Sequence, residues 1–497
     1  MWWWCALSLA STTPEMSDAE RAETFAEVLS AAAAGDEDKM TDALLSIVKD
    51  DAKAGAHGQA WAMLSTQFAR REWKLSAIAA FSKGFDLDPA YGIAQIGSML
   101  DLASEVGEDG MIGKVLSENP DLPVPNELTN RVRAMAVRWL LRQGDYGPAL
   151  AIAEGGQFEQ PGFGDLEMLR GVVLSQQERF TDAVAPLLTA EALARKQDPP
   201  DPEFLERTHL NVARAFYASG DFGRAIEFYA KVPRTSDSWL EAQFERAWSH
   251  FRGQDTNGAL AMLHNHQAPF FQERFDPEAD LLRAYSLFLM CKFGQASAEM
   301  EGFQQRWQPV IDTIDALSDQ SGSDALNAVR AFREGNEQPI PPSALRSFRA
   351  EPRMSQALAS VDRATKELAQ TEDAGELGTV AASLLKPQRD ARIETEGARA
   401  WRKVRTFRDE LYNMLTDIEL ARVDLLTMEA EMLQRAAATG ELETVDNTQR
   451  LRKLRKRKGF RPWPWQGEYW ADEVGWYVFA SRPDCPRSLS RGDEEAP

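Results

Sequence analysis

The sequence predicts an all-α fold, in which a solenoid of helical hairpins is followed by one long helix and a short aromatic-rich tail, extended or hairpin-like. Two patterns predict it. Small residues recur at intervals of 34 to 42 residues within similar helix–loop–helix contexts, and a heptad seam runs through a later segment. With 497 residues, of which 43% are hydrophobic, the chain has enough apolar material for an array of this kind.

The clearest hairpin is expected between Trp61 and Pro89. Small side chains at Ser65 and Ala77 would let two antiparallel helices cross closely, and Pro89 cannot continue the second helix. Large, small and aromatic residues follow one another there in a fixed order: Trp61, Leu64, Ser65, Phe68, Ala77, Phe81 and Pro89. The spacing resembles that of the tetratricopeptide repeat (TPR), a unit of about 34 residues, with Ser65 where glycine is usual.

The positions of this hairpin can be matched along the rest of the array. The equivalent small residues of the second helices are Ala43, Ala77, Gly113, Ala149, Ala183, Ala225, Ala259 and Ala296. The longest interval contains the Asp198–Pro202 loop, whose three prolines no helix can cross. We therefore expect a TPR-like helical repeat array of about eight units over residues 18–305.

A different organisation follows the array. Residues 306–386 are expected to form loops and helices, and residues 387–438 one long helix. Its apolar residues alternate spacings of three and four: Val404, Phe407, Leu411, Met414, Ile418, Ala421, Leu425, Met428 and Met432. This seam either packs within its own chain, with residues 352–370 as one candidate partner, or pairs with a second copy as a coiled coil by self-association through 404–432.

The two ends of the chain are unusual in composition. Residues 1–17 form an apolar segment that lacks a basic region, so it is either the remnant of a signal peptide or a frayed apolar end. Residues 462–497 combine a Trp-rich element with an acidic tail. Because aromatic rings are costly to leave in water, this element is expected to fold back over an apolar face or to dock a partner.

A basic segment, residues 439–461, contrasts with the formal net charge of −21 for the whole chain. Its basic residues are Arg450, Arg452, Lys453, Arg455, Lys456, Arg457, Lys458 and Arg461. They either neutralise the acidic array or bind an anionic surface, such as an anionic membrane surface or an acidic partner. The acidity of the chain makes nucleic acid the least favoured ligand.

The sequence contains no recognisable catalytic constellation, so we expect no enzyme, no cofactor and no metal site. His264 and His266 are expected in a solvated turn, because the pair has no further metal ligand nearby. Cys291 and Cys485 could form a disulfide, which requires an oxidising compartment, or Cys291 could be a buried small apolar residue. An enzyme with its site in residues 310–400 remains an alternative.

The repeat geometry also predicts a binding surface. In a TPR array the first helix of each unit lines the concave face, and its exposed positions recur once per unit. In the last three units these are Leu210, Arg214, Tyr217, Phe244, Trp248, Phe251, Leu281, Tyr285 and Phe288. Such a row of aromatic residues suggests a groove for an apolar peptide or helix. The chain's own C-terminal helix or tail is the competing occupant.

A second resemblance concerns residues 240–303 and 462–485. The Ala247-Trp248, Ala268–Phe271 and Asp276–Ala279 sequences, with Trp463–Glu473, are similar to TPR proteins of myxobacteria and bdellovibrio-like bacteria. That resemblance implies a non-catalytic TPR scaffold for protein–protein interactions in a bacterial cell envelope or periplasm. The alternative is a cytoplasmic TPR regulatory or assembly factor that dimerises through its C-terminal coiled coil.

Overall fold

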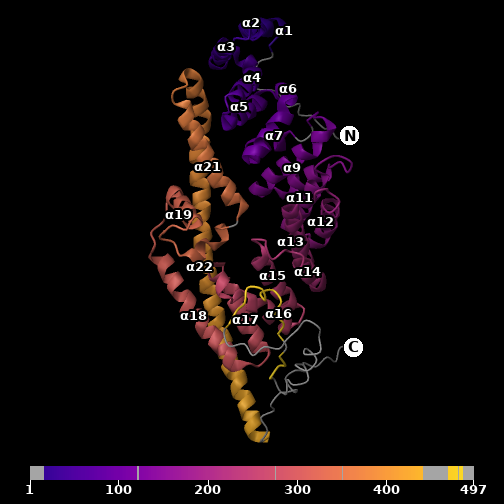
Figure 1. The fold of residues 1–497 in the computed structure, drawn as a ribbon, viewed down its shortest axis with the longest axis vertical. Helices are drawn as coiled ribbons and strands as arrows, with labels where there is room; N and C mark the ends of the chain where they lie inside the picture. The colour runs from indigo at the N-terminus through magenta and orange to yellow at the C-terminus, as the bar shows by residue number, and fades with distance from the viewer. Residues whose placement is uncertain are drawn as a thin grey trace, which may run out of the picture. The chain divides into compact units, whose positions relative to one another are not determined.

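The computed structural model describes residues 16–119, 122–274, 276–349, 351–439, 468–479 and 481–484. The predicted all-α class is confirmed, because this described part contains helices and no strand. The chain divides into two compact units, whose helices are labelled in chain order in Figure 1. Unit 1 comprises residues 1–197 and 352–396, and unit 2 comprises residues 198–351 and 397–497.

Unit 1 contains sequential helical hairpins. A short helix, α1 (Asp18–Thr24), precedes them. The hairpins are α2 (Ala26–Ala34) with α3 (Glu37–Lys49), α4 (His57–Arg70) with α5 (Lys74–Leu87), α7 (Ile96–Val106) with α8 (Asp109–Glu118), α9 (Asn126–Gln143) with α10 (Tyr146–Glu154), and α11 (Phe163–Gln176) with α12 (Phe180–Ala194). The short helix α6 (Pro89–Gly92) lies between the second and third hairpins.

Unit 2 continues the same organisation. Its hairpins are α13 (Pro202–Ala218) with α14 (Phe222–Tyr229), α15 (Trp239–Arg252) with α16 (Thr256–His266), and α17 (Pro277–Leu289) with α18 (Phe293–Ala316). Two further helices, α19 (Gly322–Glu334) and α20 (Pro342–Leu345), follow. The expected end of the array near residue 305 falls inside α18, because Phe303, Trp307 and Ile311 extend its buried face by several turns.

The equivalent small residues of the repeats lie in the second helices, as the repeat pattern predicts. Ala149, Ala183, Ala225, Ala259 and Ala296 are completely buried. Gly113 in α8 has no room for a side chain, since a Cβ there would lie 2.9 Å from the carbonyl oxygen of Met135. The small residues therefore mark the places where helices approach closely.

The Trp61 hairpin follows its expected packing closely. Trp61, Leu64, Phe68, Ala77 and Phe81 are buried between α4 and α5. Ser65 is buried as well, and its hydroxyl donates to the carbonyl oxygen of Ala62. The closest backbone approach is at Gly84, where a Cβ would lie 2.9 Å from the Ala62 nitrogen and from the Gly58 oxygen. Pro89 starts the next short helix, at a position where its missing N–H is not needed.

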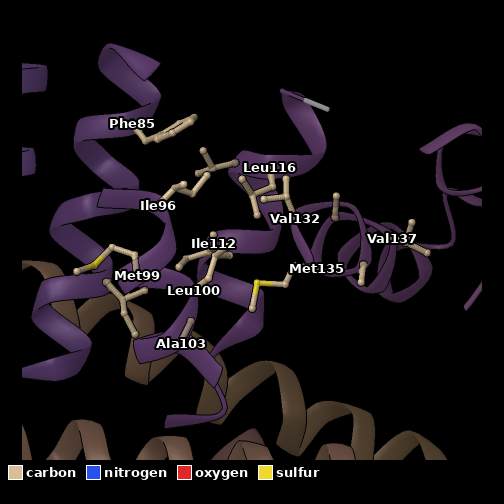
Figure 2. Close-up of a cluster of buried hydrophobic side chains, with 14 of the residues drawn as sticks. Phe85, Ile96, Met99, Leu100, Ala103, Ile112, Leu116, Val132, Met135 and Val137 are labelled. Atoms are coloured by element: carbon tan, nitrogen blue, oxygen red, sulfur yellow. The ribbon is translucent and has the colours of Figure 1, made fainter. Parts of the chain in front are cut away.

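One continuous core joins neighbouring hairpins of unit 1. Figure 2 shows its centre, where side chains of four helices converge. Labelled there are Phe85 of α5, Ile96, Met99, Leu100 and Ala103 of α7, Ile112 and Leu116 of α8, and Val132, Met135 and Val137 of α9. Each hairpin alone would leave an apolar face in water, so stacking on its neighbour provides much of the driving force for folding.

The long helix α22 (Gly375–Thr439) begins well before its expected start at Pro387. Pro387 lies inside the helix, where burial of the neighbouring Leu377, Ala381 and Leu385 compensates for the hydrogen bond that a proline cannot make. The helix passes through both units, and α21 (Pro352–Thr371) packs with its first part in unit 1.

The heptad seam of α22 is buried within unit 2. Val404, Leu411, Ile418 and Leu425 are almost inaccessible to solvent. Helix α18 supplies contacts to it: the rings of Trp307 and Phe407 meet edge-on at 6.3 Å (Figure 1 shows the two helices side by side). Residues 352–370, the partner considered from sequence, form α21 of unit 1.

Glu367 of α21 caps a distant helix. The first turn of α5 has no capping side chain of its own. The Glu367 carboxylate instead accepts hydrogen bonds from the backbone N–H groups of Leu75 (3.0 Å) and Ser76 (2.7 Å), and from the Ser76 hydroxyl (2.6 Å). These donors are the ones that a helix N-terminus leaves unsatisfied, and the helix dipole favours the negative charge.

We predict that Glu367→Gln loosens α5. The amide group keeps one acceptor but turns an NH₂ group toward N–H donors, so a buried donor loses its partner at a cost of about 1–3 kcal/mol. Amide hydrogen exchange over residues 74–87 should accelerate roughly 5- to 150-fold. The exposed Glu372, just past the end of α21, gives a matched control as Glu372→Gln. Equal exchange in both variants would contradict the capping role.

Candidate partner-binding face

The predicted groove residues of unit 2 lie on α13, α15 and α17, the first helices of its three hairpins. Their neighbours Ala213, Ala247 and Ala284 are buried against the second helices. Leu210 and Leu281, two of the nine predicted groove positions, are instead buried, whereas the other seven remain half-buried or exposed. We call this surface the first-helix face; it consists of Arg214, Tyr217, Phe244, Trp248, Phe251, Tyr285 and Phe288.

Trp248 and Phe251 form the aromatic centre of this face. Their rings meet edge-on with centroids 5.6 Å apart. The Trp248 side chain of α15 lies near the Glu278 carboxylate of α17 and lowers its pKa, against the larger effect of burial. Both rings keep part of their surface exposed, so they can contact a ligand without repacking the core.

Arg214 holds α13 to α15 and does not stand free. Its guanidinium group contacts the Glu245 carboxylate at 2.7–3.0 Å and the Glu241 carboxylate at 2.9 Å. Burial alone would lower the pKa of Arg214, but Glu245 and Glu241 raise it above its ordinary value. Burial raises the pKa of Tyr217, and the nearby charge of Arg252 partly opposes this rise.

The remaining aromatic residues are not part of that centre. Phe244 contacts His266 of α16 edge-on at 5.8 Å, and Phe288 leans against Phe293 of α18 at 6.3 Å. Tyr285 lies within electrostatic range of Asp417 and Asp424 of α22. The chain's own long helix therefore borders the α17 edge of the face, as one of the two expected occupants of the groove.

Sequence reasoning missed the carboxylates that frame the face. Burial raises the pKa of Glu241, and the nearby Arg214 only partly opposes this rise. The Glu241 side chain nevertheless keeps 58% of its surface exposed. Burial and the charges of Asp276 and Glu410 likewise raise the pKa of Glu278. Glu241 and Glu278 each lie three residues before a predicted groove position, a repeat signal that could have identified them.

The described part of the tail, residues 468–479 and 481–484, folds back onto unit 2, which agrees with one of the two expectations for it. We call it the strap. Arg234 donates to the carbonyl oxygen of Ala471 (2.6 Å), and the Asn265 side chain accepts from the Gly475 N–H (2.7 Å). Gly475 has φ = 94° and lies against the Trp239 ring, so only glycine fits there.

The far end of the strap reaches the turn between α17 and α18. The N–H of Asp484 donates to the Met290 carbonyl at 2.8 Å, and the Asp484 carboxylate pairs with Lys292 at 3.1 Å. Cys291, between these two residues, is buried and disulfide-bonded. Cys485 lies outside the described residues, so the Cys291–Cys485 pairing stays a prediction. The basic residues of 450–461 and the first 15 residues lie outside them too.

The two histidines do not lie in a solvated turn, contrary to expectation. Both belong to the last turn of α16. His264 stacks on Tyr469 of the strap at 4.9 Å and meets Tyr477 edge-on at 4.7 Å, while His266 is buried. The aromatic tail converts this turn into an interior site. Among the residues with described side chains, no group of three metal-ligating residues is gathered anywhere.

Comparison with protein-family models and with curated proteins gives no match for this chain. In the described ranges no helix combines the length and apolarity needed to cross a membrane. We therefore infer the function from the paired helices and their surfaces.

We predict that acid loosens the strap. Burial, followed by the charge of Arg283, lowers the pKa of His264 from 6.5 to about 4. Between these values the solvated imidazole binds a proton that the packed one excludes. The stabilising contribution is thus complete above about pH 6.5 and is lost as the pH falls toward 4. Protection factors of the amides of residues 468–479, which are exchange rates corrected for the pH dependence of the exchange chemistry itself, should fall more between pH 7 and pH 5 in the native chain than in His264→Gln. An equal response would refute this role of His264.

Non-reducing peptide mapping checks the covalent attachment of the strap. We expect one disulfide-linked peptide pair that contains Cys291 and Cys485. Reduction should release it and accelerate amide exchange at residues 481–484 before it affects α13. Free thiols at both positions in the native protein would contradict the pairing.

Proposed function

We propose that this protein is a non-catalytic scaffold of the TPR type, which holds a protein partner on the first-helix face of unit 2. Sequential hairpins with buried small residues at the repeat positions support the TPR assignment. The observation that carries the binding proposal is the pair Trp248 and Phe251, half-buried and packed edge-on on a face that also carries Glu241 and Glu278.

The chemistry of this face suits an apolar peptide or amphipathic helix. Partly exposed tryptophan and phenylalanine rings provide a large contact area at low entropic cost, and such residues commonly dominate the binding energy of an interface. Arg214 is already bonded to Glu241 and Glu245 within the chain, so it keeps α13 and α15 in place. The face is thereby preorganised for its ligand, which lowers the cost of binding.

We propose a bacterial cell envelope as the location. The disulfide bond of Cys291 supports this proposal, because such bonds persist in oxidising compartments and are rare in the cytosol. The alternative, a cytoplasmic factor that dimerises through the 404–432 seam, has less support. The seam from Val404 to Leu425 is buried against its own chain, so dimerisation there would require α18 to be displaced.

The test is affinity capture from native cells with the full chain as bait. The double variant Trp248→Ala, Phe251→Ala should no longer capture the partner. For the purified pair the dissociation constant should rise at least about 30-fold, because each of the two aromatic side chains contributes roughly 2 kcal/mol or more. Helical content should remain unchanged, since both rings lie at the surface.

Phe158→Ala is the matched control, because Phe158 is an exposed aromatic residue of unit 1. This variant should capture the same partner with unchanged affinity. Binding that survives in the Trp248, Phe251 double variant would refute the proposed face.

A further inference from the structure

Helix α22 carries a second apolar row on the side opposite its buried seam. Tyr412, Leu420, Val423 and Leu426 each keep 61–63% of their surface exposed, and Leu433 keeps 55%. We call this row the outer stripe. At 100° per residue its members point on average about 130° away from the buried seam, and they extend over about 32 Å.

The outer stripe is unusual for a surface. Scattered exposed apolar residues need no explanation, but contiguous ones indicate an interaction site. Its successive spacings of eight, three, three and seven residues keep all five side chains on one half of the helix, where another helix could cover them. The buried seam already satisfies the need of α22 for packing within unit 2, so the outer stripe is not required for the fold.

Acidic side chains border the outer stripe. Asp417, Asp424 and Glu431 recur every seven residues along one edge, and Glu419 lies within the row itself, seven residues from both Tyr412 and Leu426. Residues 409–434 contain seven Asp or Glu and only one basic residue, Arg422, which gives 1 − 7 = −6. Arg422 is itself paired with Glu419 at 3.4 Å. This part of α22 therefore presents an apolar row with negative margins.

We propose that the outer stripe docks a basic amphipathic helix of a partner protein. Leucine-like side chains of the partner would cover Leu420, Val423 and Leu426, and lysine or arginine side chains would pair with the acidic margins. A second copy of the stripe is a poor occupant, because two such helices would bring like charges together along their whole length.

The probe is a synthetic 21-residue peptide with leucine at heptad positions a and d and lysine at e and g, added to the full-length protein. We expect saturable binding that weakens with added salt. The double variant Leu420→Gln, Leu426→Gln should bind at least tenfold more weakly, whereas Leu29→Gln, at an exposed leucine of unit 1, should not change the affinity. The same peptide with glutamate at e and g should not bind.

Several outcomes would overturn the proposal: no binding of the lysine peptide, equal binding of the glutamate peptide, or equal binding by the Leu420, Leu426 variant. A light-scattering mass twice that of the chain, which returns to the single-chain mass in that variant, would assign the stripe to a second copy. Tenfold tighter peptide binding after Lys453→Gln, Lys456→Gln and Lys458→Gln would assign it to the chain's own basic segment. Unchanged peptide binding in Trp248→Ala, Phe251→Ala would keep this site distinct from the first-helix face.

Discussion

The tight turn between the two helices of a hairpin is the constraint on which the rest of the structure depends. One residue there takes the left-handed conformation: Gly144 and Gly220 do so readily, but Glu178, Gln254 and Cys291 do so at φ = 53–61°. A non-glycine residue in this region costs about 1–2 kcal/mol. Each turn is closed by a hydrogen bond across six residues, such as Asp221 N–H to Phe216 C=O at 2.9 Å. The small residue five positions after the left-handed one is then placed against the first helix.

The first backbone N–H groups of a helix have no acceptor within that helix. In unit 1 a side chain of a C-terminal helix accepts hydrogen bonds from such groups of a second helix. Glu367 of α21 satisfies the first turn of α5. Glu108, just before α8, is buried and pairs with Arg392 of α22 at 2.8 Å and with Arg363 of α21 at 3.7 Å. Removing one partner of a buried ion pair typically costs about 3–5 kcal/mol. The late helices are thus part of the folding unit of the early hairpins.

The hairpins could be predicted because their signal is local: a turn, a small residue and aromatic residues at fixed offsets within one repeat. The heptad seam predicted a helix for the same reason, but a period of 3.5 does not identify the surface that covers it, so α18 was missed. Pro387 suggested a helix start, although packing of Leu377 and Leu385 holds the helix together through it. Glu241 and Glu278 share a repeat position and could have been found. Glu410 could not, since only the fold brings α22 near Glu278.

The raised pKa values on the first-helix face have an energetic meaning. When the pKa of a carboxyl group is higher in the folded chain than in the unfolded chain, the fold becomes less stable as the pH rises from the unfolded pKa to the folded pKa. At neutral pH, ionised Glu241 and Glu278 therefore oppose folding, by desolvation and by repulsion from neighbouring carboxylates. Hairpin packing does not require acidic residues at these positions. A ligand that brings positive charge removes part of this cost, and an acidic ligand adds to it. We therefore expect the proposed partners of the first-helix face and of the outer stripe to combine apolar with basic side chains.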